Sequence, residues 1–334
     1  MATPGDPSPA VLAVDGGASK TDVALVAADG TVLGQARGPA SNHQMVGLEA
    51  AVANLASTID LTRADAGLAE GDGPLCALGV YCLAGVDLAV DERRVGGAVA
   101  SAGWTAECDV RNDAFAVLRA GTTAPFGIGV VCGTGLNCVG VGPDGRRVRF
   151  PSLGELSGDF TPGGAWLGVR GLGLALRAGD GRGGPTALCR LVPDHLGLPS
   201  PEAVLEAVYT GDLPFGRLME LARVVLEAAE AGDGPSAGAV DQLAGEVVAM
   251  VAAAIGRLGL AGSAVEVVVG GGIFENSRFT GLVGDAVRGH APLAVLRPLA
   301  GRRPVLGAAL LGLDAIGAGG AAEERLRSLL SAES

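Results

Sequence analysis

The sequence predicts an α/β protein made of two related domains, because one pattern of strands and turns occurs in it twice. A strand, a glycine-rich turn, a strand, an Asp-Gly turn and a third strand follow one another over residues 11–36 and again over 127–150. Asp-Gly between apolar runs is a strong hairpin signal, so each copy predicts a three-stranded meander. Since only two copies occur, the repeat indicates two domains rather than a solenoid.

The elements expected from apolar spacing follow the same order in both halves. In the first half, we expect strands at 11–17, 21–27, 31–36, 75–83 and 109–111, and helices at 47–59, 91–102 and after 112–113. In the second half, we expect strands at 127–132, 137–141, 147–150 and 265–269, and helices at 165–176, 201–209, 217–231, 236–258, after 276–277, and 304–316. Residues 321–330 read as a short amphipathic segment.

These elements give an expected division of the chain. Residues 1–9 are rich in Pro, Gly and Ser and would form a disordered lead-in. Residues 10–120 would form the N-terminal domain, and 121–318 the C-terminal domain with helical insertions. Residues 319–334 would be a tail.

Composition excludes several classes of protein. The net charge of −12 and the aromatic content of 3% argue against a nucleic-acid partner. The longest apolar run, 247–256, is too short for a membrane span, and the first residues carry no basic charge typical of a secretory signal. The six cysteines include no CxxC pair, which favours reduced thiols in a cytoplasmic protein without a structural metal.

The first turn of the first meander has the composition of an anion site. Gly16 and Gly17 allow backbone N–H groups to approach an anion closely, and Ser19 and Thr21 add hydroxyl groups. Lys20, the only lysine of the chain, adds a point charge suited to phosphate, and Asp15 is a candidate carboxylate for Mg²⁺. The P-loop spacing is absent, and a glycine-rich β-turn without a ligand is the alternative.

The second meander carries the equivalent turn, Gly133, Thr134 and Gly135, followed by Asn137. On its own this turn is a weak signal. Paired with the first through the repeat, it predicts two hairpins that face each other across a cleft and hold one polyphosphate from both sides.

Four further segments are candidates for the chemistry. Asp113 follows Asn112 at a strand-to-helix junction and is a candidate general base, although Asn and Asp at such a junction are often only helix caps. Asn42 and His43 stand in a polar cluster suited to a sugar or to a plain loop. The glycine-rich loop 154–164, which contains Asp159, is either flexible or functional. Gly271 and Gly272 lie in a turn where a base or ribose could approach the backbone.

In this order, the segments AVDGGASKTDVAL, RNDAFAVLRAG, VVCGTGLNCVG and VVVGGGIFEN resemble the phosphate, connecting and adenosine segments of the actin-like ATPase superfamily. Within it, the chain is similar to the BadF/BadG/BcrA/BcrD-type family and its N-acetylglucosamine kinase-like members, over roughly residues 10–318. The resemblance implies two ribonuclease-H-like domains with an interdomain cleft for ATP, Mg²⁺ and an amino sugar. It also implies a homodimer.

The resemblance assigns roles to the candidates. It implies phosphate contacts from both hairpins, nucleoside contacts from Gly271 and Gly272, and sugar contacts from Asn42, His43, Asn112, Asp113, Thr134, Asn137 and Asp159. Asp113 would face the attacking hydroxyl. The family pattern near Asp159 resembles GDEGS, whereas this chain reads GDFTPGG, so the contact with the N-acetyl group is open.

The implied activity is phosphorylation of the 6-hydroxyl of an amino sugar, N-acetylglucosamine first. Other acceptors are glucosamine, N-acetylmannosamine, N-acetylmuramic acid and glucose. An ATP-driven activator of an acyl-CoA dehydratase and a nucleotide-responsive regulatory protein are the alternatives from other classes.

Overall fold

The computed structural model describes residues 8–69, 71, 73–299 and 301–330. The chain forms two compact units, the first from residues 1–129 and 299–334 and the second from 130–298. Most of the expected lead-in, residues 1–7, lies outside the described residues, and the first strand already begins at Pro9.

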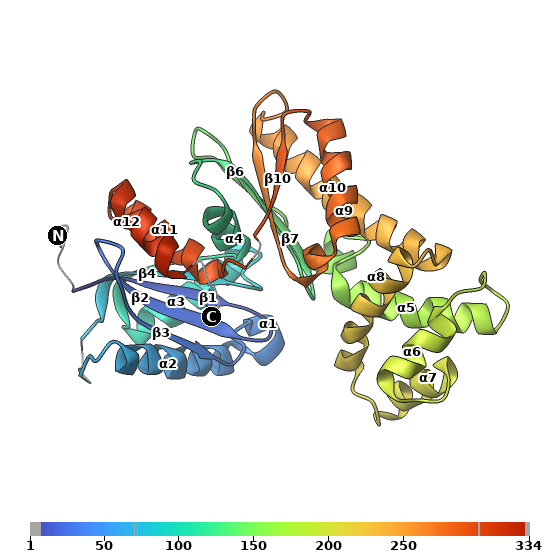
Figure 1. The fold of residues 1–334 in the computed structure, drawn as a ribbon. Helices are drawn as coiled ribbons and strands as arrows, with labels where there is room; N and C mark the ends of the chain where they lie inside the picture. Colours follow the sequence, from blue (N-terminus) through green and yellow to red (C-terminus); the bar gives the residue numbers. More distant parts are fainter. Residues whose placement is uncertain (1–7, 70, 72, 300, 331–334) are drawn as a thin grey trace. The chain divides into compact units, whose positions relative to one another are not determined.

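The first unit is built on a five-stranded mixed sheet (Figure 1). Its strands, in spatial order, are β3 (Val32–Gly38), β2 (Thr21–Ala27), β1 (Pro9–Gly16), β4 (Cys76–Leu83) and β5 (Thr105–Arg111). The meander β1–β2–β3 is antiparallel, and β4 and β5 continue the sheet in parallel with β1. The expected meander and both later strands are therefore confirmed, with β5 four residues longer at its start than expected.

Helices cover both faces of this sheet. The short α1 (His43–Val46) precedes α2 (Leu48–Asp65), and α3 (Ala89–Ala102) follows β4. Because side chains alternate along a strand, Leu12 and Val14 point to one face, where they form a core with Leu55 of α2 and Val95 of α3. The residues between them point to the opposite face, which α4 (Ala114–Gly121) and α11 (Pro304–Ala315) approach.

The structure corrects the expected boundary of the C-terminal domain, because α11 and α12 (Gly320–Leu330) belong to the first unit. Two glycines of α11 explain this. A Cβ atom on Gly307 would overlap the backbone of Ala116 in α4, and one on Gly312 would overlap the side chain of Val11 in β1. Glycine at these positions lets α11 pack directly on the first sheet, a contact that sequence order does not reveal.

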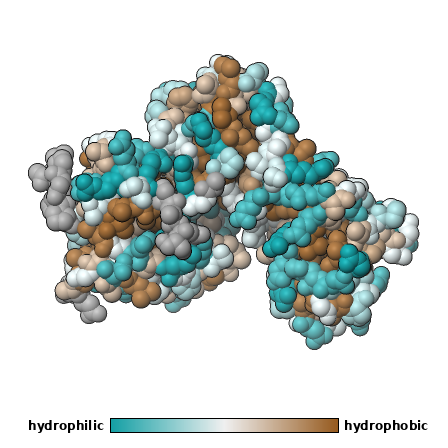
Figure 2. Space-filling model, viewed as in Figure 1, coloured by the Kyte–Doolittle hydropathy of each residue, from teal (hydrophilic) through white to brown (hydrophobic). Residues whose placement is uncertain are grey.

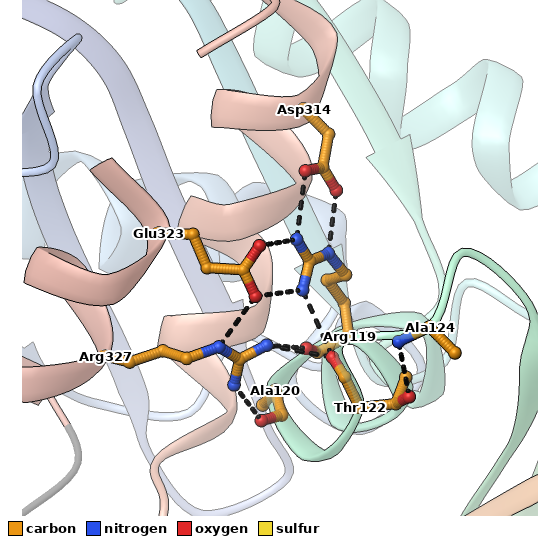
Figure 3. A network of polar contacts seen from close by, with 7 residues as sticks. All are labelled: Arg119, Ala120, Thr122, Ala124, Asp314, Glu323 and Arg327. Carbon is orange, nitrogen blue, oxygen red and sulfur yellow. Dashed lines mark hydrogen bonds and ion pairs between the residues drawn. The ribbon is translucent and has the colours of Figure 1, made fainter. Parts of the chain in front are cut away.

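A network of ion pairs fixes α12 to the same unit (Figure 3). Arg119 of α4 donates to Asp314 of α11 (2.7 Å) and to Glu323 of α12 (2.8 Å). Arg327 of α12 donates to Glu323 and to the carbonyl of Ala120 at the end of α4, both at 2.8 Å. Hydrogen bonds from Arg119 and then Arg327 lower the pKa of Glu323 to about 2. The segment expected as a surface tail is therefore a docked helix.

The second unit repeats the strand order of the first. The strands of its sheet, in spatial order, are β8 (Arg147–Arg149), β7 (Leu136–Val141), β6 (Gly127–Cys132), β9 (Glu266–Gly270) and β10 (Val295–Pro298). The first three residues of β6 still belong to the first unit. Replacing each strand of the first sheet by the strand five places later in the chain reproduces this order. The expected duplication is confirmed at the level of topology.

Helices inserted between β8 and β9 make up much of the second unit. They are α5 (Gly164–Gly179), α6 (Leu188–Leu196), α7 (Pro201–Thr210), α8 (Leu221–Glu230) and α9 (Gly234–Leu258), and α10 (Ser277–His290) follows β9. The sequence missed α6, which contains Pro193, and β10, whose four residues are too few for a periodic pattern. Figure 2 shows hydrophilic side chains over much of the visible surface of α5 to α8.

By length and composition, α9 could cross a membrane, since its most apolar window has a mean hydropathy of 1.5. Over half of that window is buried inside the protein. The buried residues of α9 recur along its whole length, from Ala239 to Leu258, as in the core helix of a folded domain.

Candidate active site

Five paired residues form a row across the first sheet, which we call the charged row: Arg37, Asp22, Asp15, Cys82 and Arg111. Asp15 of β1 is paired with Asp22 of β2 on one side and with Cys82 of β4 on the other. Asp22 is paired with Arg37 of β3, and Cys82 with Arg111 of β5. Side chains of directly paired residues project from the same face of a sheet, so two acids lie between two arginines.

The acids of this region crowd one another. Burial raises the pKa of Asp15 well above its usual range, and the carboxylates of Asp113 and Asp22 raise it further. Burial also raises the pKa of Asp113 to about 6. Lys20 and Arg303 act in the opposite direction on Asp15. Asp15 and Asp113 therefore form a coupled pair of half-buried acids in the first unit.

Asn112 holds the start of α4 in place. It is buried, and its side-chain oxygen accepts the N–H of Ala114 at 2.9 Å. Its amide donates to Asp87 at 2.9 Å, and Gln44 donates to the other oxygen of Asp87 at 3.1 Å. Asn112 therefore positions Asp113, the N-cap of α4, and its expected contact with a sugar stays a prediction.

The first glycine turn leaves a run of backbone donors open. The N–H of Gly17 donates to the carbonyl of Lys20 at 2.8 Å. Among the described residues, the amides of Ala18, Ser19 and Lys20 have no acceptor, and the side chains of Ser19 and Lys20 are exposed. Successive free amides of this kind suit an anion.

Thr21, expected as a phosphate ligand, instead serves the fold. It is buried, with its hydroxyl 2.6 Å from the carbonyl of Pro39 and 2.8 Å from the hydroxyl of Ser41. A Cβ atom on Gly16 would also overlap Ser41 and Leu83. Thr21 thus binds the turn to the segment before α1, and Gly16 allows the two to pack closely.

The second glycine turn has similar geometry. The N–H of Gly133 donates to the carbonyl of Gly135 at 3.0 Å, which closes the turn. Thr134 and Gly135 are exposed, and their amides have no backbone acceptor within the described ranges. The turn is also tied to α5, since Gly164 donates to the carbonyl of Gly133 at 2.8 Å and Ala165 to that of Thr134 at 2.9 Å.

Two glycines with positive φ allow this close packing. Gly163, at φ 91°, precedes α5, and a Cβ atom there would overlap the backbone of Gly135. Gly271, at φ 95°, would place a Cβ atom against the carbonyl of Cys132. Gly271 thus supports the turn instead of facing open space, whereas the Cβ position of Gly272 meets nothing within 4 Å.

The polar cluster before α2 is ordered by capping. The side-chain oxygen of Asn42 accepts the N–H of Gln44 at 2.9 Å, and its amide group has no partner in the described chain. The Nε2 atom of His43 lies 3.4 Å from Asp91 of α3. Asn42 can therefore offer a donor, while His43 faces the body of the first unit.

In the second unit, Asp159 is fixed within a structured loop. Asp159 is buried, and the hydroxyl of Ser157 donates to it at 2.5 Å. Burial raises the pKa of Glu246 of α9, the carboxylate of Asp159 raises it further, and the backbone of Phe160 lowers it. Phe160 itself is 78% exposed, and the buried hydroxyl of Thr161 has no partner among the described residues.

Asn137 lies on β7, beyond the second turn. Its side-chain oxygen accepts the N–H of Cys138 at 2.8 Å, so this oxygen serves the strand.

The structure gathers the sequence candidates into two groups, one in each unit. Asp15, Lys20, Asn42 and Asp113 belong to the first unit, whereas Asp159 and the three turn residues 133–135 belong to the second. The cleft expected between the two domains stays a prediction.

Sequence reasoning missed Asp22, Arg303, Asp87 and Cys82. For Asp87 a signal existed, since it comes shortly after the carboxyl end of the parallel strand β4. Asp22 and Cys82 could be placed only from the strand register of the folded sheet, and Arg303 only from the contact of the start of α11 with Asp22.

Two units of equal strand order, each with a glycine turn, and the first with the crowded acids Asp15 and Asp113, define a duplicated ATPase fold of the actin-like type. The chain belongs to the BadF/BadG/BcrA/BcrD ATPase family, whose profile matches residues 12–312.

Relatives with known names support this assignment. The chain is 28% identical over 272 residues to an N-acetylmuramic acid/N-acetylglucosamine kinase of Clostridium acetobutylicum, covering 80% of this chain and 87% of the relative. It is 27% identical over 313 residues to an N-acetyl-D-glucosamine kinase of Dictyostelium discoideum, covering 91% and 97%. A solved structure of a candidate N-acetylglucosamine kinase from Chromobacterium violaceum superposes with a TM-score of 0.71 at 26% identity, covering 92% of this chain and 99% of that one.

Proposed function

We propose that this protein is an ATP-dependent sugar kinase that phosphorylates the 6-hydroxyl of an amino sugar, with N-acetylglucosamine as the first acceptor to test. The observation that carries the proposal is Asp113, a half-buried carboxylate at the start of α4 whose pKa is raised to about 6. A base with a pKa near the working pH is suited to accept the proton of an alcohol. The names of two relatives favour the acyl-amino sugars as acceptors.

In the proposed reaction, the oxygen of the sugar hydroxyl attacks the γ-phosphorus of ATP. The bond from the γ-phosphorus to the β,γ-bridging oxygen breaks, ADP leaves, and Asp113 accepts the hydroxyl proton. Phosphoryl transfer depends mainly on positioning and on stabilisation of charge. Asn112 supports the positioning, because its two hydrogen bonds fix the backbone that carries Asp113.

The two glycine turns are the proposed phosphate ligands. The open amides of Ala18, Ser19 and Lys20 provide donors in the first unit, and those of Thr134 and Gly135 in the second. The ammonium group of Lys20 adds positive charge. Gly272, with open space at its Cβ position, is the proposed neighbour of the nucleoside.

The acids of the first unit fit a Mg²⁺ ion. The carboxylate of Asp113 lies close enough to raise the pKa of Asp15, and this pair of acids favours a cation, whereas Asp22 is already paired with Arg37 and Arg303. Mg²⁺ is usually held by one or two carboxylates together with substrate phosphates and water, so a cage of protein ligands is not required. We propose that Asp15 holds Mg²⁺ through water; when bound, the ion would neutralise charge on the phosphates.

Asn42 and Asp159 are the proposed sugar contacts, because each offers a polar group from a rigid segment. The exposed Phe160 next to Asp159 is suited to an apolar substituent of the sugar such as an acyl methyl group. Phe160 stands at the position where the family pattern GDEGS has its second acid.

The activator of an acyl-CoA dehydratase fits the structure less well. That function calls for cysteines that hold an iron–sulfur cluster between two subunits. Cys132 and Cys138, the cysteines near the second turn, are both buried within β6 and β7. Their positions serve the core of the second unit rather than a subunit surface.

The proposed function is tested by measuring ADP release with N-acetylglucosamine, N-acetylmuramic acid, glucosamine, N-acetylmannosamine and glucose. We expect sugar-dependent ADP release that is fastest with one of the N-acetylated sugars. If none of these sugars stimulates release while the protein still binds ATP, the proposal is wrong.

The raised pKa of Asp113 predicts the pH dependence of the reaction. Below about pH 6 the carboxyl group is protonated and cannot accept the hydroxyl proton. The value of kcat/KM for the sugar, which reports groups of the free enzyme, should therefore fall as the pH is lowered through about 6 and level off above about pH 7. A kcat/KM that stays constant from about pH 5 to about pH 8 would contradict the role of Asp113 as the base.

A further inference from the structure

Arg303 stands where the chain returns to the first unit, immediately before α11. Its Nη2 atom donates to Asp22 at 2.8 Å, and its Nη1 atom donates to the side chain of Gln35 at 2.9 Å. The side chain is only 16% exposed. Its Nε atom is buried and has no partner among the described residues. The enclosed guanidinium group therefore places a positive charge directly on Asp22.

Asp22 is the carboxylate directly opposite Asp15 in the charged row, and its side chain is 1% exposed. It accepts from two guanidinium groups, because Arg37 also donates to it, at 2.7 and 3.1 Å. The two arginines differ in their surroundings. The side chain of Arg37 is 46% exposed, so water screens its charge, whereas that of Arg303 is enclosed.

We propose that Arg303 is a positioning residue for the nucleotide, because it cancels the charge of Asp22 beside Asp15 and so allows an anionic polyphosphate to bind there. The inference rests on the proposed function only in requiring that the first unit binds a nucleotide. Without Arg303, Asp22 would keep only the half-exposed Arg37 as a partner, and more negative charge would remain beside Asp15. Arg37 already binds Asp22, and because water screens its half-exposed charge, we expect it not to make up for the loss of Arg303.

Other contacts already hold α11 in place, so Arg303 is not needed for this structural purpose. Helix α11 is fixed by the packing of Gly307 on Ala116 and of Gly312 on Val11. It is also linked to α4 through the ion pair of Asp314 with Arg119. Loss of one ion pair at its start should therefore leave α11 in place.

The test compares four variants by calorimetric titration with MgADP and with a non-hydrolysable MgATP analogue. We expect Arg303→Gln to weaken both affinities about tenfold, and Arg37→Gln, which removes the other guanidinium from the same acid, to change them by less than about twofold. Arg303→Lys, which keeps the charge, should stay within about threefold of the wild type. The double variant Asp22→Asn/Arg303→Gln restores the charge balance and should bind more tightly than Arg303→Gln alone.

The melting temperature of each variant is measured in parallel, to establish that it is folded. Equal effects of Arg303→Gln and Arg37→Gln, or a double variant that binds no better than Arg303→Gln, would overturn the inference. These outcomes are independent of the acceptor, because no sugar is present. A wild-type protein that binds the nucleotides but phosphorylates no sugar would refute the kinase proposal and leave this inference to be decided by the titrations.

Discussion

Asp113→Asn should lower kcat by about 10³-fold while the affinity for MgATP changes by less than about twofold. The amide has nearly the shape of the carboxylate but cannot accept the proton of the sugar hydroxyl. The substitution also removes a charge whose burial is unfavourable, as the raised pKa shows. The variant should therefore melt at or above the temperature of the wild type, so that activity and stability change in different directions. Steady-state kinetics, nucleotide titration and a thermal melt measure the three quantities.

Asp60→Asn is the matched control, because Asp60 is an exposed acid on α2 of the same unit. This variant should keep wild-type kcat. If Asp113→Asn retained more than about a tenth of the wild-type kcat, Asp113 would not be the general base. Loss of nucleotide binding would likewise contradict the role we assign to it.

Among substitutions of glycine by alanine, Gly307→Ala should lower the stability of the fold most. The new Cβ atom would overlap the carbonyl of Ala116, so α11 and α4 would have to move apart. Overpacking that displaces backbone costs about 3 kcal/mol in the free energy of unfolding. Because α11 begins next to Arg303, the same displacement should also weaken nucleotide binding. Calorimetric melting and nucleotide titration measure the two effects.

Gly97→Ala is the control for Gly307→Ala. Gly97 is an exposed glycine of α3, in the same unit, and a Cβ atom there meets nothing within 4 Å. Alanine favours a helix over glycine by about 1 kcal/mol, so this variant should melt slightly above the wild type. The packing account fails if Gly307→Ala melts as high as Gly97→Ala.

Local chemistry in the sequence was sufficient to predict much of the fold. The Asp-Gly turns defined both meanders, because their backbone requirement is satisfied by few residues. The last helices could not be assigned in this way. Their own sequence contains no pattern that predicts the packing of α11 on β1, a strand near the opposite end of the chain.

The site was predictable to a similar extent. The glycine turns and Asp113 were found because each lies within one short segment. The charged row was not, because it depends on the register of four strand pairs. Arg303 lies 281 residues from its partner Asp22, a distance that no local pattern spans.

The most direct test of the kinase proposal is to identify the product formed from ATP and an N-acetylated sugar by ³¹P nuclear magnetic resonance. We predict one equivalent of ADP for each equivalent of a phosphate ester whose phosphorus couples to the two protons of carbon 6. Phosphate found on another hydroxyl, or ATP hydrolysed to free phosphate without any sugar ester, would contradict the account.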